Sequence, residues 1–332
     1  MALDVIVKID LAQPIGSIGL GTPLLLATGA TKDMEYTECK SLTAVKDAGF
    51  ADTTDLYKAA RILFKQDDAP AVIAVCATTG TAKEWLDVTD NIVKGWRQLL
   101  VFGENINVQE IITVIDTTRD KMYFADIDID SKETYSTQDV ERTVLVYAKA
   151  TEDVPSYAAA VVGATAGKPA GGINYKNMII KGVKAHDLKD SELGAIHAKG
   201  GLTIVKKSGD IVTSMGKVAG GQYIDLRDAI DYVISNIEYR TQKVLNLNDK
   251  IKFDNTGIAI LENACVDVMR DAYSKGIIAT DENGEPMYAV NYVRREDTEA
   301  SDRAARNYKG GQFTFTCAGA VDTVNVLGEL SI

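Results

Sequence analysis

Ala71-Val-Ile-Ala-Val-Cys-Ala77 is apolar at every position. Successive side chains of a β-strand point to opposite faces, so a strand with one solvent-exposed face alternates between apolar and polar residues. A short run that is apolar on both faces is typical of a central strand in a parallel sheet, which helices cover on both sides. This stretch therefore predicts an α/β layer domain built around it.

Predicted helices and strands alternate around this stretch. The sequence predicts strands at Leu24–Thr28, Gln98–Phe102, Lys121–Asp126 and Thr143–Lys149, and helices at Thr54–Gln66, Thr81–Gly95, Asn107–Thr117 and Pro155–Gly163. In the first helix a threonine caps the start, and Leu56, Ala60 and Leu63 share one face. This alternation favours a largely parallel sheet.

The pattern changes near Gly171, where a polar connector begins that runs to Gly201. Beyond it the sequence predicts a hairpin, two long amphipathic helices and two strands, at Leu202–Lys206, Ile211–Met215, Asp225–Val244, Asn255–Lys275, Met287–Val293 and Gln312–Ala318. We therefore predict an α/β domain over residues 22–198 followed by an α+β C-terminal domain over residues 199–319.

Both ends of the chain alternate as strands do, and each has no obvious partner next to it in the sequence. One face of Asp4–Asp10 carries Val5, Val7 and Ile9, and one face of Thr323–Ile332 carries Val324, Val326 and Leu330. A terminal strand leaves a row of backbone N–H and C=O groups to be paired. We define residues 1–21, with a glycine-rich joint at Gly16–Gly21, as the N-terminal arm and residues 320–332 as the C-terminal arm. Either arm can pair within its own fold or with another copy of the chain.

Composition excludes several functional classes. The net charge of the 332 residues is −11, which argues against direct binding of nucleic acid, because that needs a basic face. No apolar run approaches the roughly 18 residues that span a bilayer, so we expect no direct membrane insertion. No secretory signal is visible at the N-terminus. Four cysteines stand far apart, and none has metal-ligand spacing, so we expect buried thiols and no metal site.

The sequence contains no clear catalytic motif. Gly163-Ala-Thr-Ala-Gly167-Lys168-Pro169 resembles a phosphate loop, but its glycines are one residue too close, and a proline replaces the hydroxyl that reaches Mg²⁺. Both histidines, His186 and His197, fall in the polar connector, away from any nucleophile. We expect no catalytic residues and no cofactor, with an α/β enzyme that binds a nucleotide or phosphate at Gly163–Lys168 as the alternative.

The order of segments resembles the tail sheath proteins of contractile phage tails and of related bacteriocin-like particles. Thr54–Val75 is similar to the family's helix ending in Phe-x-Gln before a strand, and Ser156–Asn174 is similar to its alanine- and glycine-rich helix. Gly201–Val233 matches best, with its hairpin, Gly216 and Tyr223-Ile-Asp-Leu-Arg227 entering a helix. A charged segment at Asp297–Arg306 before a final strand also fits.

This resemblance implies a structural role without enzymatic activity. Subunits would form hexameric rings that stack helically around a tail tube protein, with baseplate and tail terminator proteins at the ends. The sheath would assemble in the bacterial cytoplasm and remain in a virion or phage-tail-like particle. Its contraction would drive the tube through a cell envelope. A non-contractile tube or shell subunit is a further alternative.

The resemblance also implies roles for parts of the chain. The arms would add strands to the C-terminal domains of neighbouring subunits, and the α/β domain would face outward. As the receiving edge we predict the hairpin, with Ile204, Val205, Ile211 and Val212. As tube-facing candidates we predict Arg303, Arg306 and Lys309, which could equally form a solvated helix face balanced by Asp297, Glu299 and Asp302.

Overall fold

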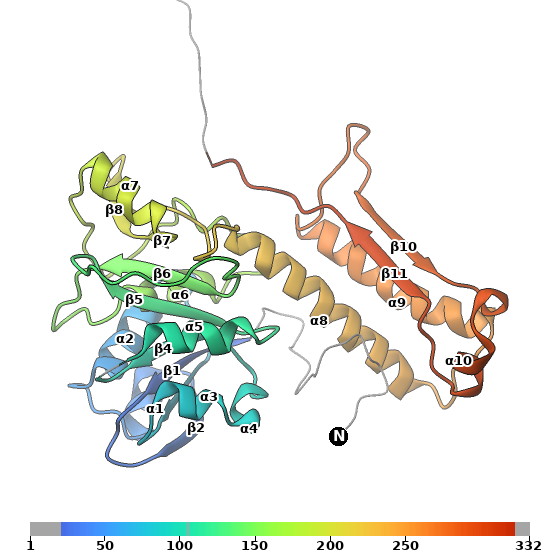
Figure 1. Ribbon diagram of the computed structural model, residues 1–332, viewed down its shortest axis with the longest axis horizontal. Helices are drawn as coiled ribbons and strands as arrows, with labels where there is room; N and C mark the ends of the chain where they lie inside the picture. Colours follow the sequence, from blue (N-terminus) through green and yellow to red (C-terminus); the bar gives the residue numbers. More distant parts are fainter. Residues whose placement is uncertain (1–20, 105, 323–332) are drawn as a thin grey trace, which may run out of the picture.

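A computed structural model of the chain describes residues 21–104 and 106–322. Within them the chain forms an α/β domain, from which a long helix leads into an elongated C-terminal domain (Figure 1). The predicted combination of a parallel-sheet α/β domain with a following α+β domain is confirmed. The predicted arm strands lie outside the described residues, together with Val5, Val7, Ile9, Val324, Val326 and Leu330.

One seven-stranded sheet forms the centre of the α/β domain, in the order β2-β3-β1-β4-β5-β6-β7. Its strands are β1 (Thr22–Ala27), β2 (Met34–Cys39), β3 (Ile73–Ala77), β4 (Trp96–Phe102), β5 (Met122–Asp128), β6 (Thr143–Ala148) and β7 (Gly201–Leu202). Only β2 is antiparallel to its neighbour. Every residue of β3 is buried, as the apolar run at Ala71–Ala77 predicts.

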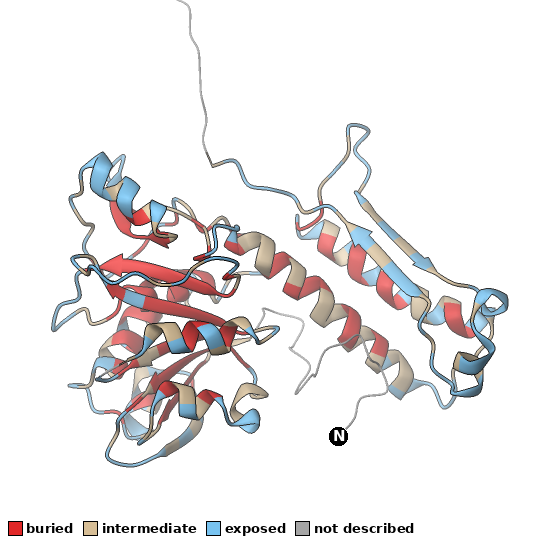
Figure 2. Ribbon diagram, viewed as in Figure 1, coloured by how far each residue is buried: buried red, intermediate tan, exposed pale blue. Residues whose placement is uncertain are grey.

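Helices cover both faces of the sheet (Figures 1 and 2). Alternate residues of β1 show this division, because Leu25 packs in one core and Leu24 and Leu26 pack in the other. The Leu25 side is covered by α1 (Leu42–Asp47), α2 (Asp55–Phe64) and α6 (Ala158–Thr165). The opposite side is covered by α3 (Ala82–Leu86), α4 (Thr89–Ile92), α5 (Val108–Asp116) and α7 (Asp190–Ala198).

The C-terminal domain is built on two long helices that pack side by side, α8 (Ile224–Leu247) and α9 (Asn255–Ser274). Val233 and Ile237 of α8 share a core with Cys265, Val268 and Met269 of α9. A two-stranded antiparallel sheet of β10 (Tyr288–Tyr292) and β11 (Gly311–Phe315) lies against α9. Between these strands, η1 (Arg295–Asp297) and α10 (Ala300–Ala304) lie at the end of the molecule farthest from the α/β domain (Figure 1).

The hairpin of β8 (Ile204–Lys207) and β9 (Asp210–Thr213) packs with the α/β domain, although the sequence analysis assigns it to the C-terminal domain. β7 extends the large sheet beside β6, and Leu202, Ile204 and Val218 lie in the core beneath α2 and α6. Apart from Ala170, the residues of the second core begin with α8. We therefore place the domain boundary at Tyr223, the N-cap of α8, instead of at residue 199.

The single helix predicted over Thr81–Gly95 is two short helices, α3 and α4. Asn91 explains how the break is stabilised, because its side-chain amide donates to the carbonyl of Trp85 at 2.9 Å. The carbonyl of Asn91 in turn accepts a hydrogen bond from the indole N–H of Trp96 at 2.7 Å. These bonds satisfy backbone groups that a continuous helix would pair internally. Among the described residues, no helix is both long and apolar enough to cross a bilayer.

Candidate assembly surface and the joint behind it

The sheet of β10 and β11 has one apolar face and one polar face. Tyr288 pairs with Phe315 and Val290 with Phe313 across the strands, and these side chains pack against the core that α9 shares with α8. The alternate residues Ala289, Asn291, Gln312 and Thr314 are exposed. Aromatic and β-branched pairs directly opposite each other stabilise an antiparallel ladder. The sheet is therefore fixed on its helix by one face only.

Both outer edges of this sheet are open within residues 21–104 and 106–322. β10 and β11 pair with each other, and neither has another strand along its outer edge in that part of the chain. Unpaired N–H and C=O groups on a strand edge form a template for a further strand. The described residues thus offer two edges to which extended segments can add.

The β8–β9 hairpin, which the sequence analysis predicts as the receiving edge, has much of its backbone engaged by its own chain. The N–H of Ile180 donates to the carbonyl of Ile211 at 2.9 Å, and that of Thr213 donates to Met178 at 3.0 Å. On the other strand, the carbonyl of Ile204 accepts from His186 at 2.9 Å. Ile204, Val205 and Val212 are buried, and Ile211 is half-buried. The hairpin is therefore a poorer receiver than β10 and β11.

The three tube-facing candidates differ in their surroundings. Arg303 donates to the backbone carbonyls of Thr298 and Arg295, so its guanidinium stabilises the segment just before α10. Lys309 pairs with Asp302 at 2.6 Å. Arg306 follows α10 with a positive φ of 56°, a conformation common at helix C-termini, and it forms no ion pair within the described residues. Of the three, Arg306 alone presents a cation that is not engaged by a described carboxylate or carbonyl.

A buried ion cluster joins α8 to the α/β domain. Arg97 donates to Asp231 at 2.7 Å and to Asp228 at 2.6 Å, and the side chains of all three are almost fully buried. Arg142 binds both oxygens of Asp231, at 2.9 and 3.0 Å. The hydroxyl of Tyr175 donates to the second oxygen of Asp228 at 2.7 Å. Two cations thus neutralise two anions, and each carboxylate oxygen accepts at least one hydrogen bond.

Electrostatics in this cluster follow from burial and mutual charge. Burial alone pushes the pKa of Arg97 down, but the charges of Asp231 and Asp228 raise it above its ordinary value. Burial lowers the pKa of Arg142, against the attraction of Asp231. Breaking a buried pair from one side leaves an uncompensated charge and is strongly destabilising. The cluster therefore fixes the orientation of α8, and with it the C-terminal domain, on the sheet.

The joint between α8 and the sheet was not predicted, although charged residues in the sequence indicate it. Arg97, Lys121 and Arg142 stand at the amino ends of β4, β5 and β6, which are neighbours in the sheet. The first turns of α8 carry Asp228 and Asp231. Cations at the start of three apolar strands need buried anions, and an amphipathic helix with two aspartates on its apolar side supplies them.

The structure also brings together a serine and a histidine that the sequence analysis did not pair. His197 Nε2 lies 3.0 Å from the hydroxyl of Ser214. Ser214 is only 3% exposed, and its oxygen accepts the N–H of Thr203. Burial lowers the pKa of His197, as do Lys207 and Lys176. A catalytic nucleophile must be accessible to its substrate, and the buried Ser214 is not. The contact between His197 and Ser214 therefore stabilises the turn between β7 and β8 and does not form a catalytic dyad.

Two places where α/β domains commonly bind ligands are filled by the chain itself. The carboxyl ends of β1 and β4 meet at the topological switch point, where the N–H and hydroxyl of Thr28 both donate to the carbonyl of Phe102. A Cβ added to Gly103 would lie 2.5 Å from the carbonyl oxygen of Thr28, so the two loops touch. At the start of α6, the carboxylate of Asp126 accepts the N–H groups of Tyr157 and Ala158. This takes the position of a bound anion.

Within Gly163–Lys168, the two glycines serve the close packing of a helix and a loop. A Cβ on Gly163 would lie 2.5 Å from the carbonyl oxygen of Leu63, and one on Gly167 would lie 2.1 Å from that of Asp68. Both glycines therefore allow α6 to approach α2 and the loop after it. Lys168 pairs with Asp68 at 3.3 Å. The two glycines that the enzyme alternative needs for a phosphate are thus packed against protein backbone, and Lys168 faces a carboxylate.

Several solved structures with a similar fold are structures of sheath proteins. The helical sheath of the anti-feeding prophage in its contracted state matches with a TM-score of 0.71 at 13% identity, covering 98% of both chains. The sheath of PVC, an extracellular contractile injection system, matches in its contracted state with a TM-score of 0.72 at 11% identity, covering 99% of this chain and 97% of that one. A sheath tail protein from Listeria innocua matches with a TM-score of 0.57 at 10% identity, covering 90% and 94%. No family model matches the sequence, and a search of curated proteins finds no significant relative. The chain therefore shares the fold of these contractile sheath proteins.

Proposed function

We propose that this chain is the structural subunit of a contractile sheath, which polymerises helically around a tail tube and drives that tube through a cell envelope. The observation that carries the proposal is the reciprocal coverage: 98% of this chain aligns with 98% of a sheath subunit from a contracted particle. The filled switch point and the occupied start of α6 also favour a structural role over an enzymatic one.

Strand exchange between subunits would hold the sleeve together. The open edges of β10 and β11 are the receivers, and the alternating segments near both ends of the chain, at residues 4–10 and 323–332, are the added strands. A two-stranded sheet is marginal by itself and gains from further strands. Each C-terminal domain would thereby connect neighbouring copies through backbone hydrogen bonds that persist while the domains move.

The arrangement of the subunit follows from this role. Stacked hexameric rings would place the α/β domain outward and the α10 end toward the tube protein, with Arg306, Arg303 and Lys309 as its contact residues. A contact that must break during contraction has to be small and polar. Baseplate and tail terminator proteins would cap the sleeve, which assembles in the bacterial cytoplasm and remains in a virion or phage-tail-like particle.

Contraction would be driven by packing between α/β domains. At about 25 cal/mol per Å², burying a few hundred additional Å² per subunit yields on the order of several kcal/mol. Summed over a sleeve of many subunits, this makes contraction effectively irreversible.

Truncation of the arms tests the proposal. Chains lacking residues 1–10 or 323–332 should remain folded monomers, because the cores lie within the described residues, but should form no sleeves. Negative-stain electron microscopy with and without tube protein compares them with the full chain. Normal sleeves from either truncated chain would contradict strand exchange. Full-chain sleeves of a single diameter under every condition would instead favour a non-contractile shell.

A further inference from the structure

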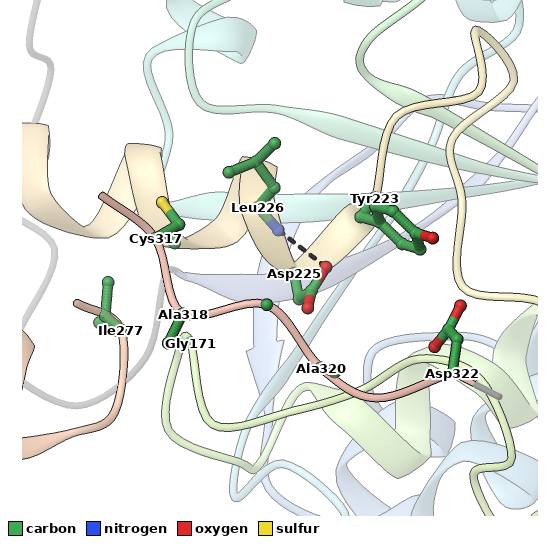
Figure 3. A pocket seen from close by; sticks show the side chains of 11 residues that line it. Gly171, Tyr223, Asp225, Leu226, Ile277, Cys317, Ala318, Ala320 and Asp322 are labelled. Atoms are coloured by element: carbon green, nitrogen blue, oxygen red, sulfur yellow. Dashed lines mark hydrogen bonds between the residues drawn. The ribbon is translucent and has the colours of Figure 1, made fainter. Parts of the chain in front are cut away.

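After β11 the chain returns to the α/β domain before the described residues end. Thr316–Ala318 still belongs to the C-terminal domain: the N–H of Ala318 donates to the carbonyl of Ile277, and the carbonyl of Thr316 accepts from Ala279, both at 2.8 Å. Residues 319–322 then pass the first turn of α8, over a groove of about 180 Å³ that Tyr223, Asp225 and Leu226 help to line (Figure 3).

At the end of this crossing, Asp322 is clamped by two residues of the α/β domain. The side-chain amide of Asn174 donates to its carboxylate at 3.1 Å. The ammonium group of Lys176 donates to the backbone carbonyl of Asp322 at 2.9 Å and lies 3.8 Å from its carboxylate. The side chains of Lys176 and Asp322 are only 22% and 23% exposed. Partial burial makes such a charge-assisted contact stronger than an exposed pair.

Other charges around the clamp favour an acid at this position. Lys207 faces Asp322 as well as Lys176, and its amine donates to the side chain of Asn177 at 2.8 Å. Asp225 is the acidic neighbour: burial raises its pKa, and the charges of Asp228 and Asp322 raise it further. Two lysines and one half-buried carboxyl, that of Asp225, leave a net positive surrounding for Asp322.

We propose that Asp322 is a latch that fastens the root of the C-terminal arm to the α/β domain. This rests on the proposed function, in which a neighbouring subunit holds the arm. A pull on that arm then reaches the α/β domain directly through Asn174 and Lys176. Without the latch the pull would act on the three backbone hydrogen bonds of Thr316–Ala318 and would peel this segment from the C-terminal domain.

The latch can be measured in the unassembled chain. Val321 is 76% exposed, so a nitroxide on Val321→Cys in a Cys317→Ser background reports motion of the crossing segment. Asp322→Lys and Lys176→Asp should each sharpen the spectrum to that of a mobile label. The double variant should recover part of the restricted signal, because it restores the ion pair but not the bonds to Asn174 and to the backbone carbonyl. Asp130→Lys, which breaks an exposed pair with Lys149, is the matched control and should leave the spectrum unchanged. Equal mobility in the parent and both single variants would overturn the latch.

The assembled form tests what the latch does. Unlabelled Asp322→Lys and Lys176→Asp chains should form sleeves with tube protein. After urea-triggered contraction the fraction of unbroken sleeves should fall several-fold, and the double variant should restore part of it. Unbroken contraction at the parental level in both single variants would overturn the force-bearing role while leaving the proposed function intact. If the full chain itself forms no sleeves, both the proposed function and the force-bearing role fail. The nitroxide spectra then still show whether Asn174 and Lys176 hold Asp322.

Discussion

Arg97 is the residue on which the joint between the domains depends most. It lies at the start of β4, with a side chain only 1% exposed, and binds both Asp228 and Asp231. Replacing it with methionine keeps the apolar volume but leaves Asp228 with no cation beside it and Asp231 with only Arg142. We expect Arg97→Met to lower the free energy of unfolding by about 3–5 kcal/mol, measured by urea denaturation.

The exposed pair of Lys149 and Asp130 provides the control for this substitution. Their side chains are 66% and 68% exposed at a distance of 2.7 Å. Lys149→Met should change stability by no more than about 1 kcal/mol, because solvent screens such pairs. A similar loss of unfolding free energy in Arg97→Met and Lys149→Met would show that the buried cluster contributes no more to stability than an exposed ion pair.

Glu238 of α8 makes stability depend on pH. Both its carboxylate oxygens lack a hydrogen-bond partner among the described residues, and the side chain is buried. Burial raises its pKa from about 4.5 to about 8, with Arg119 opposing and Asp120 adding to the shift. Between these two values the folded chain holds a proton that the unfolded chain has lost, so this contribution falls as pH rises.

We therefore expect the parent chain to lose stability relative to Glu238→Gln as the pH rises from about 5 to 8, with no further relative change above that range. Urea midpoints at several pH values measure this difference. A difference that is constant across the range, or one that grows in favour of the parent, would show that Glu238 is ionised in the folded chain.

Secondary-structure elements were predictable from the sequence where periodicity was strong. Thr54, Asn107 and Lys275 mark helix ends as predicted, because caps are local chemistry. β2 and α7 were missed because neither has a continuous apolar face: β2 is an edge strand with exposed residues, and α7 buries only Ile196. The β8–β9 hairpin was recognised, but which core it joins depends on long-range packing that a sequence pattern does not contain.

Close packing of α6 on α2 gives a prediction at the scale of elements. All eight residues of α6 are buried, and Gly163 sits against the backbone of Leu63. Gly163→Val must push the two helices apart, so it should destabilise the chain by about 1–3 kcal/mol. Gly194 of α7 has nothing within 4 Å of an added Cβ, and Gly194→Ala should stabilise by about 0.5–1 kcal/mol in the same urea assay. Equal effects at both glycines would contradict this role for Gly163.

The choice between the two candidate receiving sheets is testable in assembled sleeves. A photo-crosslinking amino acid at Gln312 of β11 lies on the open sheet, whereas one at Lys206 of β8 lies on the hairpin, and both positions are exposed. We expect crosslinks between subunits from position 312 to peptides containing residues 1–10 or 323–332. Mass spectrometry of crosslinked peptides identifies them. Arm crosslinks from position 206 in place of 312 would restore the hairpin as the receiver.

For the whole molecule, α8 is a structural member of both domains. Its first turns are fixed to the sheet through Asp228 and Asp231, and its later turns form the core with α9. The sequence predicted two domains and their order, but it did not show that they are rigidly linked, because the linking charges lie in segments more than 80 residues apart. In the proposed sheath, such a link would pass motion from one domain of a subunit to the other.

A rigid link predicts that both domains unfold together. The two tryptophans, Trp85 and Trp96, lie in the α/β domain, so their fluorescence reports on that half. Cys265 is fully buried between α8 and α9, and its modification by a thiol reagent, identified in its peptide by mass spectrometry, reports on the other half. In urea the two probes should give one midpoint in the parent chain. In Arg97→Met, α8 should detach first, so the urea midpoint of Cys265 modification should fall below the midpoint of tryptophan fluorescence. Two separate midpoints already in the parent chain would mean that the ion cluster does not couple the domains.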